Sequence, residues 1–280
     1  MHELTAYFIT TDRRDAPEAL ASLRAQGIPR PVEIVRNVRP LAAAYRSTLT
    51  CETPFCLLLD DDTVLHPGVV PRLLDRFRQM RSSEPLGFKM SARVYCEAKM
   101  IFEKGGLKFL YTPLLKRVGW PDAPHVAVAQ DVVARKMGFA ALTCDIEAGV
   151  QKRGSDLDVY KKYLWIQIRA QAGQLRQPPS LPMMTERARA GPPWLWFAVL
   201  GIVDGMQAGE VSTSKDEEYM GPIGRTLDFA AVTAEDVASI VAQRGLLGAM
   251  AQPQRSRGAG AGRASRPSAP PAGTSRGTRR

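Results

Sequence analysis

Three adjacent carboxylates, Asp60, Asp61 and Asp62, are the residues of this chain best placed to do chemistry. They follow an unbroken apolar run, residues 55–59, which is short enough for a strand buried on both faces. Because adjacent acids repel one another, we expect them where that strand leaves its sheet, at the carboxyl edge where open α/β sheets bind ligands. Asp60 and Asp62 can project the same way and share a hard divalent cation, Mg²⁺ or Mn²⁺, with substrate phosphates. A solvated acidic turn is the alternative.

The elements before the acids read strand, helix, strand, helix, strand. The pattern predicts strands at 4–11, 32–35 and 55–59, separated by helices at 16–26 and 40–49. Asp15 is the expected cap of the first helix. Crossovers of this kind build a parallel sheet with helices on its faces, so the fold class is α/β. A helix at 69–80 should follow the acids.

The rest of the chain is less regular. Residues 86–109 fit either strands or a flexible active-site loop, and both remain open. We then expect a short strand at 125–129, a helix near 131–139, a strand at 141–144, a polar loop at 151–158, a helix at 159–172, irregular chain at 178–193, and helices at 194–206 and 233–250. Thr233 and Asp236 have capping-box spacing at the start of the last helix. The expected domains are 1–175, a nucleotide-binding catalytic domain, then 176–250, a helical extension, and 251–280, a disordered basic tail.

Charge and cysteine usage narrow the setting. Net charge is +10, but seven arginines and no acid lie after residue 250, and subtracting them leaves +3 for the first 250 residues. The four cysteines show no CxxC pair or zinc-ligand spacing, and no signal peptide is evident, so we expect a cytoplasmic protein. The longest apolar stretch, residues 194–203, is about half of the roughly 20 residues that a membrane span needs. Peripheral contact with the inner membrane stays open.

The order of elements from Leu4 to Met80 resembles the GT-A glycosyltransferases, most closely the bacterial family 2 type. LTAYFITTDRR is similar to that family's first strand and nucleotide-contacting loop. RPLAAAYRSTLTCETPFCLLLDDDT is similar to the helix and strand that deliver its Asp-x-Asp motif, and VLHPGVVPRLLDRF to the turn and helix that follow. The resemblance covers about the first 80 residues well and 85–175 in outline, and it is absent after 180. It implies a GT-A fold with a Rossmann-type mixed sheet.

By this resemblance, Asp60 and Asp62 hold Mn²⁺ or Mg²⁺ against the diphosphate of a nucleotide-sugar donor, while Asp61 faces the sugar or ribose. Thr11 and Arg13 lie in the nucleotide-contacting loop. Such a metal neutralises charge on the leaving diphosphate. The acceptor hydroxyl, on a glycan, a lipid or another molecule, is left undefined.

The family also places a general base near the start of a later helix, and the resemblance assigns it to Asp156 or Asp158. A helix cap is the alternative for each of them. Ser155-Asp156 stands where Glu-Asp is common in the family.

Two further residues are candidates with alternatives. Arg36 could contact donor phosphates, but Arg36-Asn37 stands where such enzymes often carry an Asp that reads uracil, which leaves the donor base open. His125 is either a metal or phosphate ligand or a structural polar residue.

Other function classes fit parts of the sequence. Asp60 and Asp62 match the nucleophile and acid/base of a haloacid dehalogenase-type phosphatase, although that motif normally lies on the first strand. A nucleotidyltransferase of similar fold would use the same metal chemistry. A protein without catalysis, whose basic tail binds nucleic acid or an anionic membrane, is the last alternative.

Overall fold

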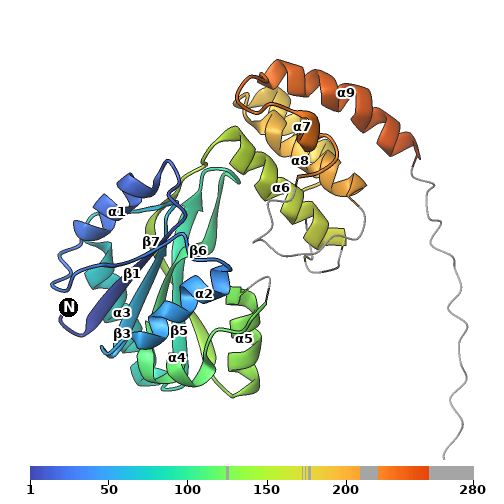
Figure 1. Ribbon diagram of the computed structural model, residues 1–280. Helices are drawn as coiled ribbons and strands as arrows, with labels where there is room; N and C mark the ends of the chain where they lie inside the picture. The colour runs from blue at the N-terminus through green and yellow to red at the C-terminus, as the bar shows by residue number, and fades with distance from the viewer. Residues whose placement is uncertain (124–125, 172, 174, 176–177, 209–219, 252–280) are drawn as a thin grey trace, which may run out of the picture.

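The computed structural model describes residues 1–123, 126–171, 173, 175, 178–208 and 220–251, with side chains in the last helix as far as Arg244. A sheet flanked by helices forms one part, and a group of helices lies beside it (Figure 1). The expected fold class, a mixed α/β sheet flanked by helices with a helical extension, is confirmed. The predicted disorder of 251–280 concerns residues that, apart from Ala251, lie outside the described chain.

The first part of the sheet follows the expected alternation. Its elements are β1 (Leu4–Thr10), α1 (Ala16–Arg24), β2 (Glu33–Arg36), α2 (Leu41–Arg46), the 3-10 turn η1 (Ser47–Thr50) and β3 (Phe55–Asp60). β1 pairs in parallel with both β2 and β3. Every residue of β1 and the first five of β3 are buried, which explains why these strands are almost entirely apolar in sequence.

The sheet is completed by strands of both directions. The remaining elements are β4 (Thr63–Leu65), α3 (Val69–Ser83), β5 (Gly87–Cys96), β6 (Ile101–Tyr111), α4 (Thr112–Val118), α5 (Val126–Lys136) and β7 (Ala140–Gln151). The sheet has 7 strands in the order β2-β1-β3-β6-β5-β7-β4. Because β6 is antiparallel to β3 and β5, and β7 is parallel to β5, the carboxyl ends of β1, β3, β5 and β7 meet at one edge. The open question at 86–109 is thereby answered in favour of strands.

Three expected elements are wrong. The first is the short strand expected at 125–129, because residues 126–129 belong to helix α5. In this helix Val126, Gln130 and Ala134 recur every four positions and are buried. The polar loop at 151–158 shrinks to 152–155, because β7 extends to Gln151 and the next helix begins at Asp156.

The third wrong element is the irregular chain at 178–193, because residues 181–190 form helix α7 (Leu181–Ala190). Ser180 accepts a hydrogen bond from the Met183 amide, and a proline in the first turn is compatible with a helix. At α1, the expected side-chain cap from Asp15 is also not formed.

The helical part has its own core. Helices α6 (Asp156–Gln171), α7, α8 (Leu195–Gln207) and α9 (Ala234–Ala251) bury a single hydrophobic cluster, which also includes Cys96 at the end of β5. The capping box predicted at α9 is present, since Thr233 N and Oγ1 both donate to Asp236. α8 is buried along most of its length, so its apolar character reflects the core, not a surface that meets a membrane.

Helix α8 also carries a buried acid that the sequence pattern did not single out. Asp204 is fully buried and accepts hydrogen bonds from the Tyr160 hydroxyl at 2.5 Å and from the amides of Ile223 at 2.9 Å and Gly224 at 2.8 Å. A buried carboxylate is tolerated when donors surround it in this way. Through Asp204, the chain at Ile223 and Gly224 is therefore hydrogen-bonded to α8, and α8 to α6.

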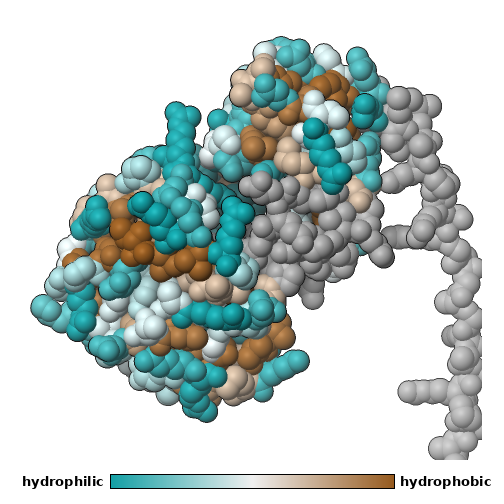
Figure 2. All heavy atoms as spheres, viewed as in Figure 1, coloured by the Kyte–Doolittle hydropathy of each residue, from teal (hydrophilic) through white to brown (hydrophobic). Residues whose placement is uncertain are grey.

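The outer surface is mixed in character. Figure 2 shows hydrophilic residues interspersed with hydrophobic ones on the visible face of both parts. Among the described residues, no helix combines the length and the apolar character needed to cross a membrane. All four cysteines are free and buried.

Candidate functional site

The three carboxylates lie at the carboxyl edge of the sheet: Asp60 ends β3, and Asp61 and Asp62 form the short turn before β4. Because β1 and β3 are parallel and Ile9 lies opposite Asp60, the loop that follows β1 runs beside this turn. The side chains of Asp60, Asp61 and Asp62 are 28%, 10% and 15% exposed. A solvated acidic turn would leave such side chains open to water, so this alternative is disfavoured.

Asp61 joins the turn to the loop after β1. Its Oδ2 accepts hydrogen bonds from Thr10 Oγ1 at 2.9 Å and from the Thr11 amide at 2.8 Å. Thr10 Oγ1 in turn accepts from the Asp12 amide at 2.8 Å. Bonds from a donor to a charged acceptor are among the stronger ones in proteins. Asp61 therefore holds the loop after β1 in place through Thr11. Its expected contact with a sugar or ribose stays a prediction.

Asp60 is held from the opposite side of β3. Tyr45 of α2 donates its hydroxyl to Asp60 Oδ1 at 3.0 Å, and Lys108 of β6 has its Nζ 3.4 Å from Oδ2. Burial, followed by the charge of Asp60, raises the pKa of Tyr45 well above its ordinary value. Tyr45 thus remains a protonated donor, and Asp60 is fixed in orientation.

The surroundings of Asp62 disfavour its charged form. Burial, and then the neighbouring charge of Asp60, raise its pKa, against the opposing effects of Arg13 and Lys162. Gln151 at the end of β7 donates its Nε2 to Asp62 Oδ2 at 3.0 Å. A raised pKa means that nearby positive charge only partly stabilises the ionised carboxylate. A cation bound beside Asp62 would stabilise it further.

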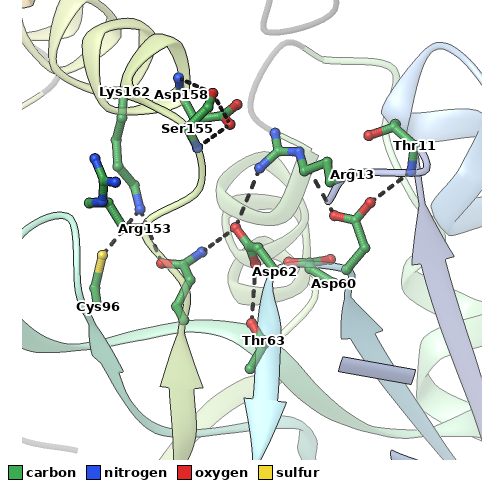
Figure 3. A network of polar contacts seen from close by, with 12 residues as sticks. Thr11, Arg13, Asp60, Asp62, Thr63, Cys96, Arg153, Ser155, Asp158 and Lys162 are labelled. Atoms are coloured by element: carbon green, nitrogen blue, oxygen red, sulfur yellow. Dashed lines mark hydrogen bonds and ion pairs between the residues drawn. The ribbon is translucent and has the colours of Figure 1, made fainter. Parts of the chain in front are cut away.

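Arg13 supplies part of that charge from the β1 loop (Figure 3). Its Nη1 lies 3.6 Å from Asp62 Oδ2 and its Nε 3.9 Å from Asp61 Oδ1. Burial alone would lower the pKa of Arg13, but the charges of Asp62, Asp158, Asp61 and Asp60 outweigh it, so the pKa is raised. The predicted nucleotide-contacting arginine is thus brought to the carboxylates.

The two candidate bases lie at the start of α6, and both have local partners. Asp158 Oδ2 accepts from the Ser155 amide at 2.9 Å and from Ser155 Oγ at 2.7 Å, while Asp156 pairs with Arg153. Asp158 contributes to the raised pKa of Arg13. It also forms a capping box with Ser155, whose Oγ accepts from the Asp158 amide at 3.2 Å, so its contacts fit both a capping role and a role in the site.

Another predicted residue, Arg36, is not brought to the carboxylates. The side chain of Arg36 is 62% exposed, and its Nε pairs with Asp12 Oδ1 at 3.2 Å, in the loop after β1, instead of with the acids. Asn37 joins the same contact by donating to Asp12 Oδ2 at 2.6 Å. His125 lies outside the described residues.

Several neighbours of the acids were missed by sequence reasoning, namely Tyr45, Lys108, Gln151 and Lys162. Tyr45 is 15 residues before Asp60, in the preceding helix, but its spacing did not point to the acids. Lys108 and Gln151 come from strands distant in sequence, so no local motif marks them. Lys162 carried a signal, because it lies four residues after Asp158 and therefore one turn further along the same helix face.

The donor set suits a hard divalent cation that keeps open positions. Within the described part of the chain, no group of three or more His, Cys, Asp or Glu side chains is arranged to hold a metal. Asp60 and Asp62 offer carboxylate oxygens, and Mg²⁺ typically binds through one or two carboxylates plus substrate phosphates and water. The residues present thus fit a metal that is completed by a phosphorylated substrate.

Comparison with known proteins gives distant likenesses in structure alone. No family model and no curated protein sequence matches the chain. A mannosyltransferase, PcManGT from Pyrobaculum calidifontis, solved in complex with GDP-Man and Mn2+, is 16% identical with a TM-score of 0.45, over 88% of this chain and 80% of its own. TarS of S. aureus is 11% identical with a TM-score of 0.43, over 72% of this chain and 88% of its own. The 4-diphosphocytidyl-2C-methyl-D-erythritol synthase of Anaerococcus prevotii is 8% identical with a TM-score of 0.38, over 56% and 94%. Likenesses of this size establish no activity for this chain.

Proposed function

We propose that this protein is a metal-dependent glycosyltransferase that moves a sugar from a nucleotide-diphosphate donor to an acceptor hydroxyl. The observation that carries the proposal is the carboxylate turn. Asp60 and Asp62 lie, mostly buried, where the ends of β1 and β3 meet, and Arg13 is drawn to them from the adjacent loop. Crevices at this edge of α/β sheets are where nucleotides bind.

In this proposal, Asp60 and Asp62 hold Mn²⁺ or Mg²⁺. Bound there, the metal would neutralise negative charge on the diphosphate leaving group. Tyr45 and Lys108 keep Asp60 oriented, and Asp61 fixes the β1 loop through its bond to the Thr11 amide. Arg13, already beside the acids, provides a guanidinium for donor phosphate oxygens.

Asp158 is the better candidate for the general base. Its charge contributes to the raised pKa of Arg13, and it lies in the first turn of α6. A base there would take the proton from the acceptor hydroxyl as the sugar transfers. Asp156, paired with Arg153, has a structural role. We also propose a cytoplasmic location, in keeping with four free cysteines.

A screen of nucleotide-sugars with Mn²⁺ tests the function directly. The expected result is a rise in melting temperature with one donor that depends on Mn²⁺, and slow Mn²⁺-dependent hydrolysis of that donor. Asp62→Asn should abolish both effects while leaving circular dichroism unchanged. Asp75→Asn is the matched control, because Asp75 is an exposed carboxylate of α3 that pairs with Arg78. Equal donor turnover in Asp62→Asn and wild type would rule out the metal role.

A phosphatase is the second candidate, and the position of the motif weighs against it. In the haloacid dehalogenase class the motif normally lies on the first strand, whereas Asp60 ends β3, after β1, α1, β2 and α2. Incubation with an aryl phosphate and Mg²⁺ should therefore release no phenol above the rate given by Asp62→Asn. Hydrolysis that depends on Asp60 would favour the phosphatase.

A further inference from the structure

Gln151 links two charged side chains that come from different parts of the molecule. Its Nε2 donates to Asp62 Oδ2 at 3.0 Å, and its Oε1 accepts from Lys162 Nζ at 3.2 Å (Figure 3). A carboxylate can only accept hydrogen bonds and an ammonium can only donate them. The amide of Gln151 therefore has one orientation that satisfies both neighbours, and this orientation points its donor at Asp62.

The topology of the sheet explains why Gln151 is available. β7 ends at Gln151, and its carboxyl end lies at the same edge as that of β3. The backbone strengthens the contact, since the Lys152 amide donates to the carbonyl oxygen of Asp62 at 2.7 Å. Both the main chain and the side chain of Asp62 are thus attached to the end of β7.

Lys162 connects helix α6 to the ends of β5 and β7. Among the described residues, no carboxylate oxygen lies within ion-pairing distance of its ammonium. Its two contacts are Gln151 Oε1 and the thiol of Cys96, whose Sγ is 3.1 Å from Nζ. Its charge also opposes the rise in the pKa of Asp62, so Lys162 acts on that carboxylate through space as well as through Gln151.

We propose that Gln151 and Lys162 are positioning residues that fix the side chain of Asp62 for metal binding. This rests on the proposed function, because it concerns the carboxylate assigned to the metal. Lys162, on α6, fixes the orientation of the Gln151 amide, and this amide fixes the orientation of the Asp62 carboxylate. Outer partners of this kind contribute about 10- to 100-fold to metal affinity in other proteins.

The direction of the effect of Lys162 distinguishes positioning from simple charge. Removing a nearby positive charge should tighten the binding of a divalent cation if only electrostatics mattered. If Lys162 acts through Gln151, its removal should weaken binding instead. The full chain is titrated with Mn²⁺ alone, and free Mn²⁺ is followed by its electron paramagnetic resonance signal.

The expected result is a loss of about tenfold in Mn²⁺ affinity for Gln151→Met and a smaller loss for Lys162→Met. In the Gln151→Met background, Lys162→Met should not weaken binding further, because its positioning effect passes through the amide. Lys161→Met is the matched control: it removes the neighbouring lysine of the same helix and should leave affinity unchanged. Should Gln151→Met fail to fold, Lys162→Met and its control carry the test.

Tighter or unchanged binding in Lys162→Met overturns the positioning role. If wild type binds Mn²⁺ and Asp62→Asn does not, while the Gln151 and Lys162 variants match wild type, only this inference falls. If wild type does not bind Mn²⁺ at all, both the inference and the metal-dependent function fall.

Discussion

The guanidinium of Arg13 lies 3.6 Å from the carboxylate of Asp62, which we propose as a metal ligand. Arg13 and a divalent cation would therefore compete for the same negative charge. Removing the positive charge should raise the affinity for Mn²⁺ alone by roughly fivefold, which corresponds to about 1 kcal/mol for a partly exposed pair.

Calorimetry of Arg13→Gln with Mn²⁺ at low salt measures this effect. The same variant should bind the nucleotide-sugar donor more weakly, because it lacks the guanidinium for phosphate. Arg14→Gln removes the adjacent, exposed arginine and serves as the control. Weaker Mn²⁺ binding in Arg13→Gln would show that Arg13 helps to build the metal site and does not compete for it.

The two candidate bases should differ in their contribution to rate. Asp158→Asn retains an oxygen that can accept from the Ser155 amide, so the cap survives while the base is lost. We expect kcat to fall by about 10²- to 10⁴-fold with little change in KM for the donor. Asp156→Asn should lower kcat only a few-fold. Steady-state kinetics with the donor found by the screen decides between them, and the reverse order would transfer the role to Asp156.

Asp61 should matter more for stability than for metal binding. In Asp61→Ala, the hydroxyl of the buried Thr10 and the amide of Thr11 lose their shared acceptor. A buried donor left without a partner costs about 1–3 kcal/mol, so we expect a loss of about 2 kcal/mol in the free energy of unfolding. Urea denaturation measures it. Asp61→Asn, which keeps one acceptor oxygen, should lose less, and equal losses would mean that the charge and not the hydrogen bond is what matters.

The raised pKa of Asp62 predicts a pH dependence of stability in the absence of metal. Between its ordinary and its raised pKa, the folded chain binds more protons than the unfolded chain, so this group makes folding less favourable as the pH rises. Asp62→Asn removes the effect and should be more stable than wild type near pH 7, with a difference that shrinks toward pH 4. Urea denaturation in EDTA at several pH values, with Asp75→Asn as the control, measures it. A difference that grows as the pH falls would contradict the shift.

The sequence predicted the parts of the molecule that depend on local signals. The buried runs of β1 and β3 and the acids after them were sufficient to place Asp60 and Asp62 at the carboxyl edge of a parallel pair. In contrast, β7 alternates exposed and buried residues irregularly and gains its length from pairing with β5, so only its first few residues looked like a strand. Ser180 and Pro182 did mark the start of α7, but the proline-rich composition around them concealed it.

The surroundings of the site depend on contacts that cross long stretches of chain. Gln151 is 89 residues from Asp62, and Lys108 is 48 residues from Asp60. Such partners become visible only once the strand order is known. Arg36 shows that closeness in sequence can also mislead. It follows β2, near the motif elements, but it pairs with Asp12 and not with the acids.

Helix α6 has consequences for any attempt to divide the protein. Its first turn bears Asp158, and its apolar face, which includes Tyr160, Tyr163 and Leu164, is covered by α8. A chain shortened to end at residue 175 would keep every proposed catalytic side chain and yet expose that face to water. Such a chain should precipitate or lose its activity. To exchange the helical part between related proteins, the junction would have to lie upstream of α6, within residues 152–155.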